Sequence, residues 1–267
     1  MSITIERPFA TTEKGKRQNN EDYIFPSSEL ATPDQRLFMV CDGVGGAEKG
    51  EIASELACDS FETYFNTFLE EEDPSEVFIN KAVRYTESRF DEYIKQNPNA
   101  QGMATTFTLL YIGNDRVTAA YAGDSRIYQF RDGEIIFRTE DHRLVNSWVK
   151  LGKITEEEVA IHPQRNVITR AISGSEHFTS ADVQLLTDIE PGDLFFLCTD
   201  GVTETFTDND LKEVFNKNNT EEIKNTIVER CVNQSKDNFS FYIIPIFDTK
   251  KNTNYKQNIL SFFYSFA

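Results

Sequence analysis

Two apolar segments that lie far apart in the sequence both end in an aspartate followed by a glycine. Residues 37–41 (LFMVC) lead into Asp42, and residues 194–198 (LFFLC) lead through one threonine into Asp200. Short apolar runs bounded by turn residues are typical of buried strands. We therefore expect two core strands that each hold a carboxylate at the strand end, where the backbone is rigid. The glycines after Asp42 let the chain turn sharply and let another group approach the main chain.

An Asp-Gly pair also has a simpler interpretation, because it is common in hairpin turns. The chain contains one such pair in Asp132 and Gly133, which lie between two strand-like runs and are predicted to form a turn. Taken alone, Asp42 fits a turn better than it fits a ligand. The second copy of the pattern, at Asp200, favours a functional role for both aspartates.

Composition argues against several classes of function. The 267 residues carry a formal net charge of -17 with a pI of about 4.6, which disfavours nucleic-acid binding and attachment to anionic lipid. The four cysteines form no CxxC pair, and the three histidines are too irregularly spaced for a zinc site. We expect reduced cysteines in a cytoplasmic protein, and the sequence contains no signal-peptide pattern and no membrane-spanning run.

The order of predicted elements indicates an α+β fold with largely antiparallel sheets. Helical periodicity is present over residues 48–70 and 74–97, and most of the strands that follow are joined by turns too short for parallel crossovers. Residues 141–170 are predicted to form a small helical insertion in which Thr155 caps a short helix. A strand is predicted to follow over residues 167–172.

Acidic residues recur at the predicted strand ends, and neither histidine nor cysteine joins them. They are Glu21 and Asp22 beside a strand start, and Asp42, Asp124, Asp200 and Asp237 at strand ends or starts. An all-oxygen set favours Mg²⁺ or Mn²⁺ over Zn²⁺ or Cu²⁺. Two divalent ions would relieve the repulsion among these carboxylates and activate a shared water for attack on phosphorus. Arg17 suits the phosphate because its planar fork donates two parallel hydrogen bonds, although a solvated turn explains it as well.

The chain resembles the metal-dependent Ser/Thr protein phosphatases of the 2C type (the PPM family) in their compact bacterial form. The similarity spans roughly residues 3 to 246. The matching segments, in order, are RQNNED at 17–22, DGVGG at 42–46, GDSR at 123–126, DH at 141–142, HPQRNVITR at 162–170, TDGV at 199–202 and DN at 237–238. Each segment is a weak signal alone, and their joint presence in this order is a strong one.

The resemblance implies a four-layer α-β-β-α sandwich, with two largely antiparallel sheets flanked by helices. Residues 141–170 correspond to a mobile flap beside the active site, which is expected to influence substrate choice more than chemistry. Residues 1–247 then form the catalytic domain. We expect the tail, residues 248–267, to dock on this domain or on a partner, because its end is apolar and aromatic.

The resemblance also implies a binuclear Mn²⁺ or Mg²⁺ centre. Asp42 would bridge the two ions, and the Gly43 carbonyl would join one of them. Asp200 and Asp237 would hold the first ion, and Glu21 would hold the second through water. A hydroxide that bridges the two ions would attack the phosphorus.

Three further assignments follow from the same resemblance. Asp22 would lie behind the ligands of the second ion, and Asp124 together with Asp200 would form a weaker third metal site. Arg17 would bind the substrate phosphate. Val44 stands where eukaryotic members carry a histidine proposed as the acid for the leaving group, so that proton must come from metal-bound water or another group.

The leading hypothesis is therefore a monomeric phosphatase that acts on phosphoserine and phosphothreonine in proteins phosphorylated by a Ser/Thr kinase. One alternative is a relative that dephosphorylates a single regulator in a partner-switching pathway. Another is a catalytically silent binding module with the same fold, and the intact set of aspartates with Arg17 argues against it. A glycine-loop nucleotide binder receives little support, because residues 43–50 fit neither GxxxxGK[ST] nor GxGxxG.

Overall fold

The computed structural model describes residues 2–44, 49–70, 73–217 and 219–250. The strands are β1 (Ser2–Ile5), β2 (Phe9–Glu13), β3 (Asp22–Phe25), β4 (Leu37–Val44), β5 (Ala104–Thr105), β6 (Phe107–Ile112), β7 (Val117–Ala122), β8 (Arg126–Arg131), β9 (Glu134–Arg138), β10 (Asp182–Leu186), β11 (Leu194–Cys198) and β12 (Phe239–Lys250). The helices are α1 (Gly50–Phe68), α2 (Glu76–Gln96), α3 (Leu144–Lys150), α4 (Glu156–Val159), α5 (Asp200–Thr203), α6 (Asp208–Phe215) and α7 (Thr220–Gln234), with short 3-10 turns η1 (Pro98–Ala100) and η2 (Ser175–His177).

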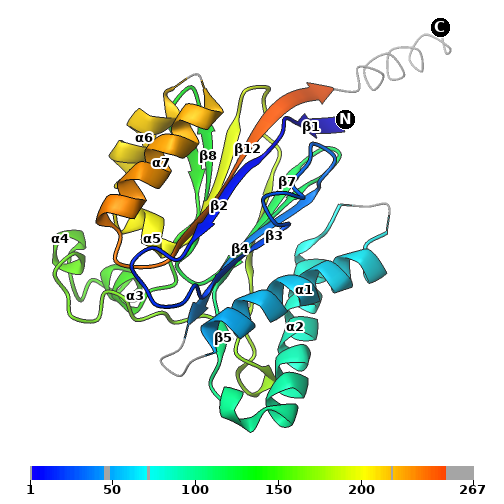
Figure 1. The fold of residues 1–267 in the computed structure, drawn as a ribbon, viewed down its shortest axis with the longest axis vertical. Helices are drawn as coiled ribbons and strands as arrows, with labels where there is room; N and C mark the ends of the chain where they lie inside the picture. Colours follow the sequence, from blue (N-terminus) through cyan, green and yellow to red (C-terminus); the bar gives the residue numbers. More distant parts are fainter. Residues whose placement is uncertain (1, 45–48, 71–72, 218, 251–267) are drawn as a thin grey trace, which may run out of the picture.

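The strands form two six-stranded sheets that face each other, with helices on both outer faces (Figure 1). One sheet has the order β1-β12-β11-β8-β9 with β2 also on β12, and the other has the order β10-β7-β6-β4-β3 with β5 on β4. Every strand pair is antiparallel. The predicted α-β-β-α sandwich is therefore confirmed.

Successive side chains of strand β4 alternate between two apolar clusters, one on each face of its sheet. Phe38 and Val40 belong to the apolar cluster between the two sheets. Leu37, Met39 and Cys41 belong to the cluster beneath α1 and α2. Because successive side chains of a strand point to opposite faces, a run that is apolar throughout is buried on both faces. A third cluster lies between the other sheet and helices α6 and α7.

Two of the short helices, α4 and α6, begin at a capping box. Thr155 accepts a hydrogen bond from the Glu158 amide, and the Glu158 side chain accepts one from the Thr155 amide, so the predicted cap is confirmed as a capping box. Thr207 and Asp210 form the same arrangement at the start of α6. Among the described residues, no helix combines the length and apolar character needed to cross a bilayer.

The predicted strand over residues 167–172 is wrong. This segment makes only two isolated bridges, from Ile168 to Arg143 and from Ile172 to Thr105. It spans the gap between the insertion and β5, so neither partner continues beside it long enough to form a ladder. Strand β12 continues to Lys250, so the first residues of the predicted tail pair with β1, while 251–267 lie outside the described residues.

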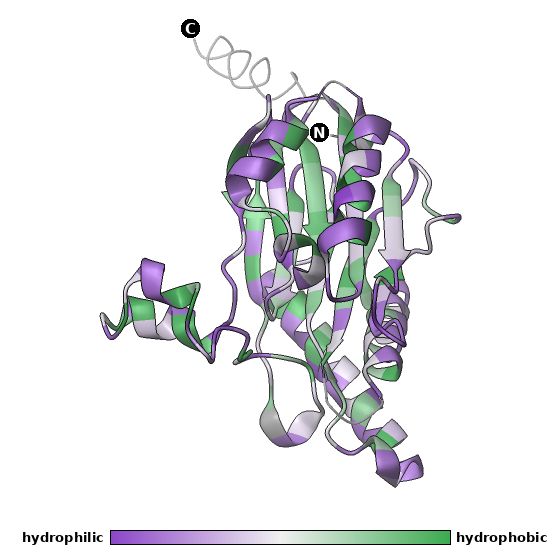
Figure 2. Cartoon of the chain, turned by 60° about the vertical axis from the view of Figure 1, so that its left-hand side comes forward, coloured by the Kyte–Doolittle hydropathy of each residue, from purple (hydrophilic) through white to green (hydrophobic). Residues whose placement is uncertain are grey.

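The helical insertion, called the flap below, comprises α3, α4 and their connections within residues 141–170. Figure 2 shows it standing away from the sandwich. Its base is a short antiparallel contact: the Leu144 amide donates to the Val167 carbonyl at 2.9 Å, and the Thr169 amide donates to the His142 carbonyl at 2.8 Å. The base also contacts the sandwich, because the His142 amide donates to the Gly123 carbonyl at 2.9 Å.

Candidate metal centre

The topology brings the predicted acids of both sheets to one edge of the sandwich. Asp22 lies opposite Asp42 in the register of β3 and β4. In the other sheet, Cys198 at the end of β11 pairs with the first residue of β8 and with Phe241 of β12. Because these strands are antiparallel, Asp124, Asp200 and Asp237 all project beyond the same sheet edge. A hydrogen bond of 2.9 Å from the Thr199 hydroxyl to Asp22 connects the two sheets there.

The backbone around Asp42 is held firmly. The Asp42 amide donates to the Thr106 hydroxyl at 3.2 Å, and the Asp42 carbonyl accepts from the Thr106 amide at 2.8 Å and the Thr105 hydroxyl at 2.9 Å. These bonds leave little freedom at the residue that is predicted to bridge two ions. These backbone hydrogen bonds thus fix the point at which the Asp42 carboxylate leaves the strand.

The clustered carboxylates retain protons more strongly than isolated ones. Burial raises the pKa of Asp22 to about 8, although hydroxyls of Ser240 and Thr199 oppose the shift. Burial, together with the charge of Asp124, raises the pKa of Asp200 to about 7. Burial and its acidic neighbours raise the pKa of Asp42 well above its usual value. Burial and mutual repulsion therefore disfavour the charged forms of these carboxyl groups, and a bound divalent cation would stabilise those charged forms.

Two arginines partly neutralise this edge. Arg17 Nη2 contacts Asp237 Oδ2 at 2.6 Å. Arg143 Nε donates to Asp124 Oδ2 at 2.8 Å, and Arg143 Nη2 lies 3.7 Å from Asp200 Oδ2. Sequence reasoning named Arg17 but missed Arg143. The signal was its place directly after the Asp141-His142 motif, although spacing alone does not show that its side chain reaches Asp124.

Glu21 and the Gly43 carbonyl lie beside the same glycine. A Cβ added to Gly50 would stand 2.8 Å from the Glu21 carboxyl carbon and 2.9 Å from the Gly43 oxygen. The absence of a side chain at Gly50 therefore lets two predicted metal ligands, the Glu21 carboxylate and the Gly43 carbonyl, lie close together. Glu51, which sequence reasoning also missed, has a buried Oε2 atom without a hydrogen-bond partner among the described residues. Burial, followed by the charge of Glu51, raises the pKa of Glu21.

Asn238 fixes the loop that carries Arg17 and Glu21. Its side-chain oxygen accepts from the Glu21 amide at 2.9 Å, and its amide nitrogen donates to the carbonyls of Lys14 and Asn19 at 2.8 Å each. The whole residue is only 4% exposed. One residue next to Asp237 therefore positions two predicted site residues from a distant part of the sequence.

The described residues do not form a complete coordination sphere. No group of three or more His, Cys, Asp or Glu side chains in this part of the chain is close enough together to hold a metal ion. The predicted acids gather at one edge, but three of them are paired with other side chains. Asp237 pairs with Arg17, Asp124 accepts from Arg143, and Asp22 accepts from Thr199. The individual ligand assignments therefore stay predictions.

Comparison with known proteins identifies the family. A family model of protein phosphatase 2C matches residues 11–234. The chain belongs to this family. A putative protein phosphatase 2C-type protein of Streptococcus pyogenes is 34% identical over 199 residues, which cover 73% of this chain and 78% of the relative. The serine/threonine protein phosphatase PstP of Mycobacterium tuberculosis is 32% identical over 213 residues, which cover 78% of this chain but only 38% of that longer protein.

Solved phosphatase structures share the architecture. The serine/threonine phosphatase Stp1 of Staphylococcus aureus matches with a TM-score of 0.80 and 30% identity, over 93% of this chain and 98% of that one. The catalytic domain of PstP in complex with two manganese ions matches with a TM-score of 0.74 and 27% identity, over 92% of this chain and 100% of that one. The family and fold expected from the sequence are thus confirmed.

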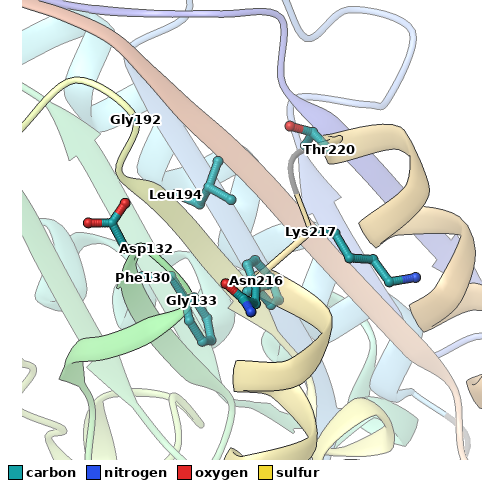
Figure 3. Close-up of a pocket in the computed structure, with 9 residues that line it drawn as sticks. Phe130, Asp132, Gly133, Gly192, Leu194, Asn216, Lys217 and Thr220 are labelled. Carbon is teal, nitrogen blue, oxygen red and sulfur yellow. The ribbon is translucent and has the colours of Figure 1, made fainter.

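A cavity of about 270 Å³ lies at the opposite edge of the sandwich (Figure 3). It is lined by the Asp132-Gly133 turn, the start of β11 and the residues after α6. Asp132 has φ 51° and Gly133 has φ 78°, so the predicted hairpin turn is confirmed. Because the acids lie at the other ends of β8 and β11, this cavity is separate from the candidate metal centre.

Proposed function

We propose that the chain is a metal-dependent phosphatase that hydrolyses phosphoserine and phosphothreonine in proteins. The observation that carries the proposal is the convergence of Asp22, Asp42, Asp200 and Asp237 at one sandwich edge, with Arg17 beside Asp237. The family membership supports the reaction class. The relative crystallised with two manganese ions supports a two-metal centre.

The chemistry of the predicted donor set suits two hard divalent ions. Asp42 would bridge them, Asp200 and Asp237 would complete the first site, and Glu21 with the Gly43 carbonyl would serve the second. All of these donors are oxygens, which suits Mn²⁺ or Mg²⁺. When bound, such ions would activate a water for attack on phosphorus.

Asp22 is assigned a supporting role. It lies across from Asp42 and accepts a hydrogen bond from Thr199, the residue immediately before Asp200. It therefore links the strand end that carries the bridging ligand to the one that carries Asp200. A change at Asp22 is expected to weaken metal binding by displacing its neighbours.

Arg17 would hold the substrate phosphate. Its side chain is 55% exposed at the rim, while Asp237 fixes one end of the guanidinium. The hydrogen bond with Asp237 raises the pKa of Arg17, which keeps the group charged. An oriented guanidinium can donate to two phosphate oxygens and stabilise the charge that develops on them.

The flap is proposed to contact the protein that carries the phosphate. Leu151, Ile161 and Val167 are exposed large apolar residues on it. An apolar surface beside an open polar site suits a protein segment better than a small phosphate ester. A monomeric state and a cytoplasmic location remain predictions, as does the Ser/Thr kinase that would supply the substrate.

A phosphothreonine peptide assay with Mn²⁺ and then with excess EDTA tests the proposal. We expect hydrolysis that depends on Mn²⁺ and stops with EDTA. Asp42→Asn is expected to abolish this activity while thermal unfolding stays cooperative, because the amide cannot supply the bridging charge. If folded wild-type protein shows no turnover with Mn²⁺ or Mg²⁺, the catalytically silent binding module becomes the better explanation. Near-normal turnover of Asp42→Asn would remove Asp42 from the bridging role.

A further inference from the structure

Arg143 lies between the two carboxylates that the family resemblance assigns to a third metal ion. Its Nε donates to Asp124 Oδ2 at 2.8 Å, and its Nη2 lies 3.7 Å from Asp200 Oδ2. The side chain of Asp124 is 1% exposed and that of Arg143 is 19% exposed. The contact is therefore largely shielded from solvent, where charge pairs are screened least.

We propose that the guanidinium of Arg143 takes the place of the third ion, so that this chain binds two divalent ions and not three. This inference rests on the proposed two-metal function, and it concerns a cation that the chain itself supplies. A divalent ion bound by an Asp124 oxygen sits about 2.0–2.6 Å from it, in space next to the bonded Nε. It would also be repelled by the fixed positive charge.

Neighbouring charges hold the guanidinium where it is. Asp141 Oδ2 lies 3.6 Å from Arg143 Nε. Asp141 itself accepts two hydrogen bonds from Arg126, at 2.6 Å and 2.8 Å. Charges of opposite sign therefore alternate from Asp200 through Arg143 and Asp141 to Arg126. Displacing Arg143 would leave Asp124 buried without its partner, which is strongly unfavourable.

The backbone of Arg143 adds a second restraint. Arg143 immediately precedes α3 and forms a bridge with Ile168, at the base of the flap. Its side chain thus fastens the flap base to the loop that carries Asp124. A third ion could enter only if the contact between Arg143 and Asp124 opened. Arg143 therefore couples the position of the flap base to the binding of an ion at Asp124 and Asp200.

Asp124 retains one oxygen that a cation could use. Its Oδ1 is buried and has no hydrogen-bond partner among the described residues. In wild-type protein, the adjacent guanidinium opposes a second cation there. Once the guanidinium is removed, both oxygens of Asp124 become available together with Asp200. Removal of Arg143 is therefore expected to create a third site that depends on Asp124.

The experiment counts bound Mn²⁺ by electron paramagnetic resonance, which detects the free aqueous ion during a titration. The samples are wild type, Asp124→Asn, Arg143→Ala, the double variant Arg143→Ala/Asp124→Asn, and Arg138→Ala. Arg138 is the matched control: it lines the same groove of about 470 Å³ as Arg143, but its guanidinium pairs with Asp208 at 2.6 Å. Thermal unfolding reports whether each variant is folded.

We expect two ions in wild type, Asp124→Asn and Arg138→Ala, three in Arg143→Ala, and two again in the double variant. A third ion in wild type that Asp124→Asn removes would overturn the inference and leave the phosphatase proposal intact. A folded Arg143→Ala protein that still binds two would also overturn it. If Arg143→Ala does not fold, the comparison of wild type with Asp124→Asn decides the question alone. Wild type that binds no ion would refute both the inference and the proposed function.

Discussion

Replacing Asn238 with alanine would release the loop that carries Arg17 and Glu21 without touching either side chain. The variant loses three hydrogen bonds, to the Glu21 amide and to the carbonyls of Lys14 and Asn19. At about 1 kcal/mol for each bond, the expected loss of unfolding free energy is about 3 kcal/mol. For a domain of this size, that corresponds to a fall in melting temperature of roughly 6–12 °C.

The effect on catalysis should exceed what the loss of stability explains. Groups that orient metal ligands typically contribute about 10-fold to 100-fold to affinity or activity. We therefore expect kcat/KM for a phosphothreonine peptide to fall by that factor at a temperature where the variant is fully folded. Excess Mn²⁺ should restore part of the rate, because Glu21 is still present.

Asn233→Ala is the matched control for this prediction. Asn233 is an exposed asparagine of α7 whose side chain donates, within the described residues, to the Glu229 carbonyl of its own helix alone, at 2.8 Å. Its replacement should change stability by less than about 0.5 kcal/mol and leave the rate unchanged. An Asn238→Ala variant that melts and turns over like Asn233→Ala would show that the loop does not depend on these three bonds.

Three other predictions follow from the same geometry. The pKa of Asp22 is raised to about 8 and that of Asp200 to about 7, so the metal-free protein loses stability as pH rises from about 4 through those values. Mn²⁺ should therefore raise the melting temperature more at pH 8 than at pH 6. An equal rise at both pH values would contradict the assignment of these two acids to the metal centre. Arg17→Lys should reduce kcat/KM by a larger factor than it changes Mn²⁺ affinity, because lysine keeps the positive charge but loses the planar guanidinium that donates two parallel hydrogen bonds. Steady-state kinetics and a Mn²⁺ titration check this prediction. An unchanged kcat/KM would argue against phosphate binding by Arg17. Thr207→Ala should lower stability by about 1 kcal/mol through loss of the α6 cap with no effect on turnover, so a large rate loss would show that α6 affects the site.

Sequence patterns predicted the strand ends well because a strand end is a local feature. The run into Asp42 and the run into Asp200 each contain their own signal: apolar residues, then an acid, then a glycine. The helix cap at Thr155 and the turn at Asp132 are local in the same sense, and both were confirmed.

Arg143 and residues 167–172 show where local patterns fail. The apolar residues of 167–172 predict a strand, yet only Ile168 and Ile172 find a backbone partner. Arg143 contacts Asp124 only because the flap base folds back onto the loop before β8. Both outcomes depend on how distant segments approach each other, and single-sequence periodicity contains no information about that approach.

The pairing of Asp22 with Asp42 has its cause in the core and not at the site. Two like charges opposite each other destabilise a pair of strands, so local electrostatics alone would favour another register. The same register, however, places Ile24 opposite Val40, and Phe25 opposite Met39. A slip of one residue would turn the apolar side chains of β3 away from the layers they fill, which costs far more than the repulsion of one carboxylate pair. The packing that stabilises the sandwich therefore forces the two acids together, at the edge where the metal centre is proposed.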